Sequence, residues 1–343
     1  MAGPEATLMR SVAAGAGVVL LVLWAYQSVW IAGWVHEDTP TVASSLAPDS
    51  GLYRQRPLTA LTWVWTQTPR TAHAVNLGLH LVIGALVGVT AWRLGLAVPG
   101  AWCAALIWLL HPMAVETAAY AAGRAEQIVV LGVLIALCGA AGAWWRGWAC
   151  AAVVGGSLVA LGGKEAGVVV LLLVPLVAWA RRRDSAWWRP AVVSGAVIAA
   201  GVWWHGGLRA VVNADTVEGL AEVTAVTWGP WLLAQSGAAG YWLLASVWPD
   251  LLTPDLDVDR LSQGARVAGL AAILALGGVG VALRVRAPVV TLALGIVVLA
   301  VIPRLVIQTP RSYLNAHQFA VPFLGLALLT GHGLACGRMR WMG

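Results

Sequence analysis

The stretch Val12–Val35, VAAGAGVVLLVLWAYQSVWIAGWV, carries no charged residue. A helix needs about 20 predominantly apolar residues to cross the hydrocarbon core of a bilayer. The run is also longer than the apolar region of a removable signal peptide, which has about 7–15 residues. We therefore predict that this stretch is a first transmembrane helix and that it is not cleaved.

Similar apolar runs recur along the chain, among them Leu81–Ala91, Val129–Ala143 and Val168–Ala180. Apolar residues make up 60% of the sequence and charged residues only 10%. A soluble domain carries roughly 25% charged residues, so this chain has too few polar side chains to cover a surface facing water. We predict an all-α polytopic membrane protein, with residues 1–343 forming one integral membrane domain.

The cysteines and the basic character exclude two other classes of protein. Four cysteines (Cys103, Cys138, Cys150 and Cys336) lie in or beside apolar runs and form no C-x-x-C pair, which argues against a disulfide framework and a zinc site. The sequence pI is near 9.6, but the basic residues are dispersed in short loops. Membrane orientation explains them better than a nucleic-acid partner does.

Lysine and arginine residues sort into two sets of loops when the apolar runs are taken as spans. One set holds 11 basic residues against two acidic ones, Glu5 and Asp184; the other holds the remaining 10 of 21 basic and 13 of 15 acidic residues. Loops rich in Lys and Arg face the cytoplasm. We therefore expect the first set, and with it both termini, to be cytoplasmic. Its basic residues are Arg10, Arg93, Arg146, Arg181, Arg182, Arg183, Arg189, Arg284, Arg286, Arg338 and Arg340.

About ten ranges then qualify as transmembrane helices. The range Gly229–Trp248 breaks their alternation, because counting it as a crossing would place the acidic stretch Asp250–Asp259 in the cytoplasm. It starts with Gly-Pro and ends before Pro249, so we predict a re-entrant or in-plane helix at the outer interface. The ten predicted spans are Arg10–Trp34, Ala74–Leu94, Val98–Leu110 continuing past Pro112, Arg124–Ala143, Trp148–Leu161, Glu165–Ala180, Pro190–His205, Val267–Leu283, Pro288–Pro303 and His317–Gly333.

The first outer loop, residues 36–72, is the longest polar stretch and opens with the adjacent carboxylates Glu37 and Asp38. Ionisable residues at membrane depth usually mark function, although a helix end in water would also explain the pair. Arg54 and Arg56 follow, and their side chains have two possible roles: binding lipid headgroups or binding a substrate. Helical spacing of Leu58, Leu61 and Trp65 predicts an amphipathic helix in the membrane interface.

The second outer segment, residues 111–127, contains four polar residues at helical spacing. Glu116, Tyr120, Gly123 and Gln127 would share one stripe if the helix ran unbroken. A polar stripe between apolar spans must face protein or a water-filled cavity. The alternative is a buried ion pair between Glu116 and Arg124 that only packs the bundle.

The third outer segment is GGKEAG, residues 162–167, at the outer end of a span. Lys164 is the only lysine of the chain, and it lies on the side that the charge rule disfavours for cations. A lysine between glycines suits a phosphate held against backbone N–H groups, whereas a lone lysine can also simply extend its amine toward water. His73, Asn76 and His80 share a helical face and predict a hydrogen-bonded polar seam, because they form a poor set of metal ligands.

Five motifs occur in a specific order along the chain. Glu37-Asp38 is followed by YRQRPLTALT (53–62), by H-x-x-N-x-x-x-H (73–80), by LHPMAVETAAYAAGRAE (110–126) and by GKEAG (163–167). This order resembles the GT-C superfamily of membrane glycosyltransferases. Within it, the chain is most similar to the membrane domain of the transmembrane O-mannosyltransferases with tetratricopeptide repeats and to their bacterial relatives. The resemblance extends from about Trp34 to Gly167 and implies a helical bundle whose first outer loop builds the active site.

The resemblance assigns roles residue by residue. It makes Glu37 or Asp38 the catalytic carboxylate, with Glu116 as a further candidate; the family usually has Asp-Asp. The late family motif R-Y-L-Y-L-P-S corresponds here to HQFAVPF (317–323), which lacks the arginine, so Arg311 or Arg304 is expected to replace it. The expected substrate-binding residues are Arg54, Arg56, His111, Tyr120, Arg124, Glu126, Lys164, Glu165 and Arg311.

The implied reaction moves mannose or a similar hexose from a polyprenyl-phosphate carrier to an acceptor hydroxyl on the outer face of a membrane, such as the bacterial cytoplasmic membrane. A carboxylate would take the proton of the acceptor, and cations would stabilise the leaving phosphate. No cofactor is required by the sequence, although a divalent cation stays open. The expected partners are the lipid-linked sugar, membrane lipids and a protein or glycan acceptor, and no nucleic acid.

A different class of protein would use the same buried acids. A proton-coupled transporter or lipid flippase could employ them as a proton relay. Its sites would lie near the bilayer midplane, whereas the polar segments here gather on one face. A non-catalytic membrane scaffold would leave these embedded charges unexplained.

Overall fold

A computed structural model describes residues 4–34, 56–142, 147–181, 188–204, 228–253, 255–306 and 314–341. These residues form helices, connecting turns and no strand, which confirms the all-helical prediction for the described part of the chain. The α-helices are α1 (Pro4–Ala25), α4 (Pro57–Val64), α5 (Pro69–Leu94), α6 (Val98–Leu110), α7 (Val115–Ala119), α8 (Arg124–Ala140), α9 (Gly147–Gly163), α10 (Val170–Arg181), α11 (Trp188–Trp204), α13 (Trp228–Ala245), α14 (Gln263–Leu283), α15 (Pro288–Val306) and α16 (Ala320–Trp341).

Short 3-10 turns connect several of these helices. They are η1 (Gln27–Ile31), η2 (Pro112–Ala114), η3 (Ala121–Gly123), η4 (Glu165–Val169), η5 (Pro249–Leu251), η6 (Val258–Arg260) and η7 (His317–Phe319). Most of these turns follow or precede a proline or a charged residue, where a continuous α-helix would lose hydrogen bonds or bury a charge.

Several helices are long and apolar enough to cross a membrane, which indicates a membrane protein. Five qualify by length and composition within the described residues: Pro69–Leu94, Ala121–Ala140, Gln263–Leu283, Pro288–Leu305 and His317–Cys336. The bent pair Val98–Leu110 and Pro112–Ala119 would make a sixth. Shorter apolar helices cover Ala13–Ala25, Gly147–Gly163, Glu165–Ala180 and Arg189–Gly201.

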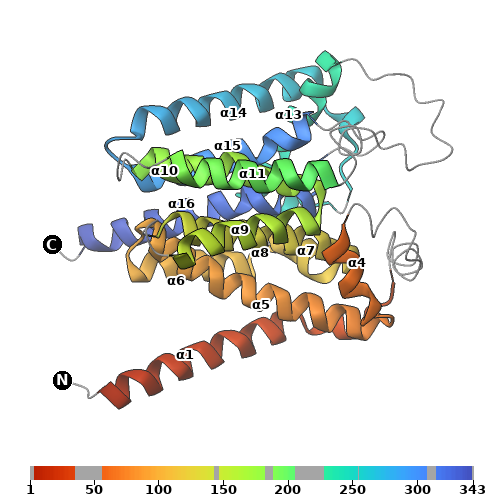
Figure 1. Ribbon diagram of the computed structural model, residues 1–343. Coiled ribbons are helices and arrows are strands. Elements are labelled where there is room, and N and C mark those ends of the chain that lie inside the picture. The colour runs from red at the N-terminus through yellow and green to blue at the C-terminus, as the bar shows by residue number, and fades with distance from the viewer. Residues whose placement is uncertain are drawn as a thin grey trace.

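The long helices run side by side, so that the molecule has two distinct ends (Figure 1). The start of α1 and the end of α16 lie at one end, whereas α4 and α7 lie at the other. Arginines at the first end lie against tryptophan rings: Arg93 is 4.6 Å from the Trp148 ring centroid and Arg284 is 4.1 Å from that of Trp179. We call the first end the basic end and the second the polar end.

Helix α5 shows how local sequence sets a helix boundary. Thr68 caps its first turn by accepting a hydrogen bond from the Thr71 backbone N–H, and Pro69 occupies the first helical position. The helix stops at Gly95, whose φ of +108° strongly favours glycine. The preceding Arg93 lies in the last turn, where a cation complements the helix dipole.

Close packing of α8 against α9 depends on small residues. A Cβ atom placed on Gly132 would lie 2.3 Å from the Ala160 backbone nitrogen, and one on Gly156 would lie 2.5 Å from that of Ala136. Contacts this short exclude any side chain at either glycine. Apolar helices in a membrane gain little from burial against one another, so van der Waals contact between closely approaching backbones supports their association.

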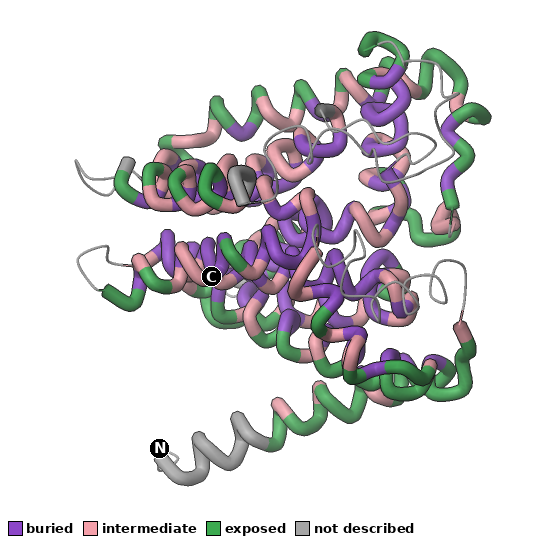
Figure 2. Tube along the Cα trace, turned by 45° about the vertical axis from the view of Figure 1, so that its right-hand side comes forward, coloured by how far each residue is buried: buried purple, intermediate pink, exposed green. Residues whose placement is uncertain are grey.

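Helix α1 is attached to the rest of the bundle only loosely. Figure 2 shows its described part mostly exposed, and its large apolar side chains include Leu20 and Trp24, 67% and 66% exposed. Val22 is buried, and so are Tyr26 and Val29, which follow the end of the helix. An apolar helix with this exposure suits contact with lipid.

The unbroken helix considered for residues 111–127 is wrong. The axis bends by 55° between Val98–Leu110 and Pro112–Ala119, because the residue before a proline is driven from helical into extended geometry; His111 has φ −73° and ψ 135°. A second break follows at Tyr120, with φ −72° and ψ 121°. The polar residues of this segment therefore do not form one stripe.

Helix α13 occupies the range for which an in-plane or re-entrant helix was predicted. Its closest approaches are to the first two turns of α14, where Gly237 meets Arg266 and Gly240 meets Gly269. The Trp231 indole N–H donates to the carbonyl of Leu305 in the last turn of α15. These approaches lie at one end of α14 and of α15, and its orientation to a membrane stays a prediction.

Candidate functional site

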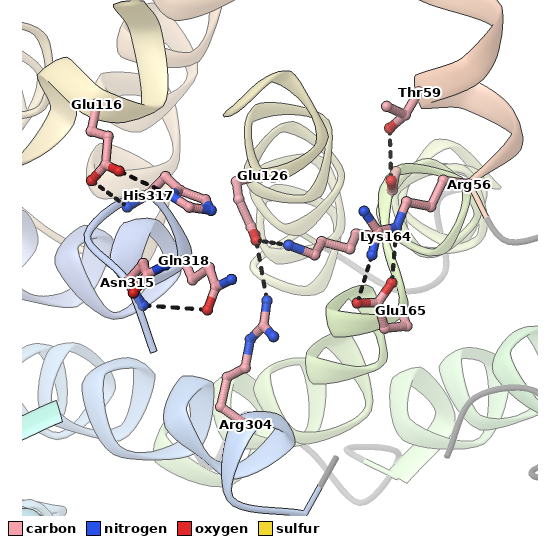
Figure 3. A network of polar contacts seen from close by, with 11 residues as sticks. Arg56, Thr59, Glu116, Glu126, Lys164, Glu165, Arg304, Asn315, His317 and Gln318 are labelled. Atoms are coloured by element: carbon pink, nitrogen blue, oxygen red, sulfur yellow. Dashed lines mark hydrogen bonds and ion pairs between the residues drawn. The ribbon is translucent and has the colours of Figure 1, made fainter. Parts of the chain in front are cut away.

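Five ionised side chains gather at the polar end, and we call them the charged cluster: Arg56, Glu126, Lys164, Glu165 and Arg304 (Figure 3). They come from the loop before α4, the first turn of α8, the α9–η4 junction and the last turn of α15. Segments far apart in sequence thus meet at one place. Burying charged groups costs free energy unless they are paired, so this arrangement needs a physical reason.

Glu126 is the centre of the charged cluster. One of its oxygens, Oε1, accepts a hydrogen bond of 2.6 Å from Lys164 Nζ and a longer contact of 3.4 Å from Arg304 Nη2. All three residues are buried, with exposures of 3%, 6% and 5% respectively. A single carboxylate oxygen therefore serves two cations.

The Lys164–Glu126 contact ties two adjacent helices together at the polar end. Burial lowers the pKa of Lys164, and the Glu126 carboxylate opposes this effect. The extended backbone of Lys164, with φ −164° and ψ 157°, separates α9 from η4. Sequence reasoning placed this lysine near a phosphate, and the structure places it against a carboxylate.

Arg56 and Glu165 form the second pair of the charged cluster. Arg56 Nε donates to Glu165 Oε2 and Arg56 Nη2 donates to Glu165 Oε1, both at 3.1 Å. This is the bidentate geometry that arginine favours. Thr59 donates to the Gly163 carbonyl at 2.7 Å. These contacts dock the start of α4 onto the α9–η4 junction.

Two of the three side chains of the predicted apolar stripe are exposed: Leu61 in α4 at 52% and Trp65 at its C-terminal cap at 80%. The third, Leu58, is half-buried and lies against Gly162, and Thr59, Ala60 and Trp63 are buried. An exposed leucine and tryptophan on one side, with polar contacts on the other, is the pattern of a helix that lies in a membrane interface.

Charge within the cluster is not balanced. Within the cluster as defined, three cations face two carboxylates, an excess of one positive charge; in the described structure the neighbouring Glu116 carboxylate is paired with His317. Arg56 and Glu165 neutralise each other through two hydrogen bonds, so the excess falls on Lys164 and Arg304, which share Glu126. A buried excess of positive charge favours binding of an anion.

Glu116 lies beside this cluster and pairs with the start of the last helix. Its Oε1 is 3.1 Å from His317 Nδ1, and its Oε2 accepts from the His317 backbone N–H at 3.1 Å. The Tyr120 ring meets the His317 ring edge-on at 5.7 Å. Figure 3 shows Gln318 and Asn315 next to this pair. The alternative of a Glu116–Arg124 ion pair is wrong.

Arg124 lies apart from the charged cluster, and its described hydrogen bonds are to neutral oxygens. Its side chain is fully buried. It donates to Asn76 Oδ1 at 2.7 Å, Thr66 Oγ1 at 2.6 Å and the carbonyls of Thr62 and Ala72 at 3.2 and 2.9 Å. Its guanidinium carbon is 4.2 Å from the centroid of the Trp63 ring. These contacts fasten the end of α4 and the start of α5 to α8.

The predicted polar seam on α5 is confirmed for two of its three residues. Asn76 donates to the carbonyls of Tyr120 and Ala121 at 2.9 and 3.2 Å, as well as accepting from Arg124. His80 Nε2 lies 3.1 Å from the Leu109 carbonyl and 3.3 Å from the Tyr26 hydroxyl. His73 is buried as well, but neither of its ring nitrogens makes a hydrogen bond.

His111 has a local structural role. Its Nδ1 accepts the backbone N–H of Met113 at 3.1 Å, which caps the turn that starts at Pro112. Its ring packs on Phe323 with centroids 4.9 Å apart. The turn holds α7, and with it Glu116, next to η7.

Four predicted site residues, Glu37, Asp38, Arg54 and Arg311, lie outside the described residues. Within the described ranges, no group of three or more His, Cys, Asp or Glu side chains is placed to hold a metal ion. Of the predicted site residues that the structure describes, the ionisable ones other than His111 and Arg124 lie in the charged cluster or at the Glu116–His317 pair; two further ion pairs, Arg260–Asp257 and Arg266–Asp259, involve no predicted site residue.

Sequence reasoning found the members of the charged cluster but not their partners. Arg304 was considered only as a replacement for a missing family arginine, and its contact with Glu126 spans 178 positions in sequence. His317 appeared in the corresponding motif without a role. A charged residue in the last turn of an apolar helix, after Pro303, is the sequence signal that marks Arg304.

The resemblance to the GT-C superfamily is a prediction drawn from the order of motifs. Comparisons of the chain with models of protein families, with curated proteins and with solved structures found no match.

Proposed function

We propose that this protein is a membrane glycosyltransferase that moves a hexose from a polyprenyl-phosphate carrier to an acceptor hydroxyl. The observation that supports it best is the charged cluster, which combines a buried excess of positive charge with carboxylates at one end of an apolar helical bundle. A lipid-linked sugar phosphate has matching parts: a tail for the bilayer and a phosphate for the cations.

In this proposal, ten helices cross the membrane, the basic end faces the cytoplasm and the polar end faces outward. The arginine–tryptophan contacts at the basic end agree with this orientation, because cytoplasmic loops are rich in Arg and tryptophan favours the interface. Helix α4 then lies in the outer interface and α13 lies in or re-enters the outer leaflet. The multi-pass protein would reside in a membrane such as the bacterial cytoplasmic membrane.

The acceptor is activated by a carboxylate of the first outer loop. Asp38, or Glu37 beside it, takes the proton as the acceptor oxygen attacks the anomeric carbon. The new glycosidic bond forms while the bond from that carbon to the phosphate oxygen breaks, and the polyprenyl phosphate leaves with the electron pair. A single displacement of this kind inverts the anomeric centre.

The leaving phosphate is stabilised by Lys164, with Arg304 in place of Arg124. Preorganised cations act most strongly where charge develops in a site shielded from water. Arg124 is assigned a structural role instead, because its described hydrogen bonds fasten α4 and α5. Glu116, held by His317, is the reserve candidate for the base.

The decisive experiment offers radiolabelled sugars on several polyprenyl phosphates to membranes that contain the protein. We expect transfer from at least one donor, and we expect the Asp38→Asn variant to lose about 10²-fold in turnover, because the amide keeps the shape but cannot accept a proton. The Glu37→Gln variant is the matched control and should be milder.

Two results would contradict the proposal. Full activity in the double variant Glu37→Gln/Asp38→Asn would place the base elsewhere, with Glu116 the next to test. Absence of transfer from every donor, together with proton-coupled movement of a solute or lipid, would favour the transporter or flippase class.

Orientation has its own test. Single cysteines at Ser45 and Asp255 should react with a membrane-impermeant thiol reagent in intact cells, whereas one at Ser185 should not. Labelling at Ser185 with silence at Ser45 would invert the topology and remove the outer active site with it.

A further inference from the structure

Glu126 contacts both buried cations through one oxygen, and the two contacts are unequal. The 2.6 Å bond from Lys164 is short even for a charge-assisted hydrogen bond, whereas the 3.4 Å contact from Arg304 exceeds the usual range of about 2.7–2.9 Å. Arg304 is therefore held weakly by the carboxylate that it faces.

The Arg304 guanidinium has donor capacity left over. Arginine carries five N–H donors, and among the described residues its one hydrogen bond is the long contact with Glu126. The side chain is 7% exposed, and among the described residues none of its nitrogens is both fully enclosed and unpartnered. Its spare donors are therefore open to a ligand, and an anion between Arg304 and Lys164 would supply the acceptors.

We infer that Lys164 and Arg304 form a binding site for a phosphoryl group, and that Glu126 is an internal competitor that occupies both cations until this group arrives. The ligand would take the Arg304 donors first and then share Lys164 with Glu126. Glu126 is thus a positioning residue, which keeps two like charges together without a ligand and weakens binding of the phosphoryl group.

The identity of the ligand rests on the proposed function: the phosphoryl group would be the head group of a polyprenyl phosphate. The same chemistry is offered by free phosphate and, less well, by a phosphodiester lipid with one negative charge. The neighbouring charges leave this site to Lys164 and Arg304: Arg56 is neutralised by Glu165, and among the described residues the Glu116 carboxylate is paired with His317.

The inference is tested by binding, independently of sugar transfer. The full-length protein in nanodiscs is titrated with geranyl monophosphate, inorganic phosphate or phosphatidylglycerol, and affinity is read from ligand-dependent thermal stabilisation. We expect Arg304→Gln to bind geranyl monophosphate roughly tenfold or more weakly, because a charge-assisted contact is lost. We expect Glu126→Gln to bind it roughly tenfold more tightly, because the competing charge is gone.

Asp259→Asn is the matched control. Like Glu126→Gln, this substitution removes one negative charge. Asp259, however, is 81% exposed, and its ion pair is with Arg266 at 3.5 Å. We expect parental affinity in this variant, so that tighter binding by Glu126→Gln cannot be ascribed to net charge.

Parental affinity in Arg304→Gln would overturn the inference, as would tightening by Asp259→Asn equal to that by Glu126→Gln. If Glu126→Gln does not fold, Arg304→Gln decides alone, because it leaves the 2.6 Å Lys164–Glu126 pair in place. Equal binding of inorganic phosphate would assign the site to a soluble source. Arg304-dependent binding without sugar transfer would sustain the anion site while the transferase proposal fails.

Discussion

Two buried arginines at the polar end, Arg124 and Arg304, are held in contrasting ways. Arg124 donates to neutral oxygens of Asn76, Thr62, Thr66 and Ala72 and lies against an indole ring. Arg304 has one long contact, to a carboxylate oxygen that a lysine already binds. Both look alike as isolated cations in apolar sequence.

The number of acceptors around a buried arginine indicates whether it serves the fold or a ligand. An arginine surrounded by many fixed acceptors holds segments of the fold together, and replacing it leaves several buried oxygens unsatisfied. An arginine with few partners has donors to offer to a ligand. Substitutions at the polar end should therefore separate effects on folding from effects on ligand binding.

Replacing Arg124 should damage the fold most. In Arg124→Gln, at least three buried acceptors lose their donor, each at a cost of about 1–3 kcal/mol, so the free energy of unfolding should fall by roughly 3 kcal/mol or more. Thermal unfolding of the purified protein in detergent measures this effect. Parental stability with selective loss of donor use would instead restore Arg124 to the phosphate site.

Replacing Lys164 should affect activity more than folding. In Lys164→Met, Glu126 keeps Arg304 as a counter-charge, so the loss of unfolding free energy should be about 1–2 kcal/mol, less than the roughly 3–5 kcal/mol typical when a buried charge is left alone. Transfer of sugar should fall tenfold or more. Both are measured on the same preparation; normal transfer in a folded Lys164→Met variant would remove Lys164 from the phosphate site.

The Glu116–His317 contact should have an intermediate effect. Glu116→Gln keeps an acceptor for the His317 backbone N–H but loses the charge, so we expect a loss of about 1 kcal/mol in unfolding free energy with most of the turnover retained. A loss of turnover near 10²-fold, measured against Asp38→Asn in the same assay, would promote Glu116 to the general base.

The smallest effect is expected for Arg56 and Glu165. Their side chains are 30% and 20% exposed, so solvent screens the pair, and partly exposed ion pairs contribute about 0–1 kcal/mol. A double-mutant cycle with Arg56→Ala and Glu165→Ala should give a coupling energy within this range. A coupling above 2 kcal/mol would make this pair a main anchor of α4.

Much of the local structure followed from short patterns. The end of α5 before Gly95 and the helix α4 were predicted, because each depends on residues within one or two turns. The predicted start at Ala74 was five residues late, because it missed the cap at Thr68 and the proline that follows it. The break at Pro112 was readable too, yet the stripe of Glu116, Tyr120, Gly123 and Gln127 was considered on the assumption of continuity. The second break, at Tyr120, has no proline to announce it.

The ion-pair partners that meet across the bundle could not be predicted from the sequence. Glu126 meets Lys164 over 38 positions and Arg304 over 178, and Glu116 meets His317 over 201. Such pairings depend on how each helix is rotated about its axis and how far it slides along its neighbour. Those quantities come from close contacts such as Gly132 with Ala160, which no local window contains.

Composition was enough to predict an apolar, helical chain, which the described residues confirm, because backbone groups in an apolar environment must be satisfied within each segment. The distribution of basic residues predicts its orientation in the membrane. The sequence by itself also determined which ionisable residues lie beside apolar runs. Only the tertiary structure decided that Arg124 is fastened to neutral oxygens while Lys164 and Arg304 share one carboxylate. The physical reason is that a buried charge takes the acceptors that packing brings to it, and packing is a property of the whole bundle.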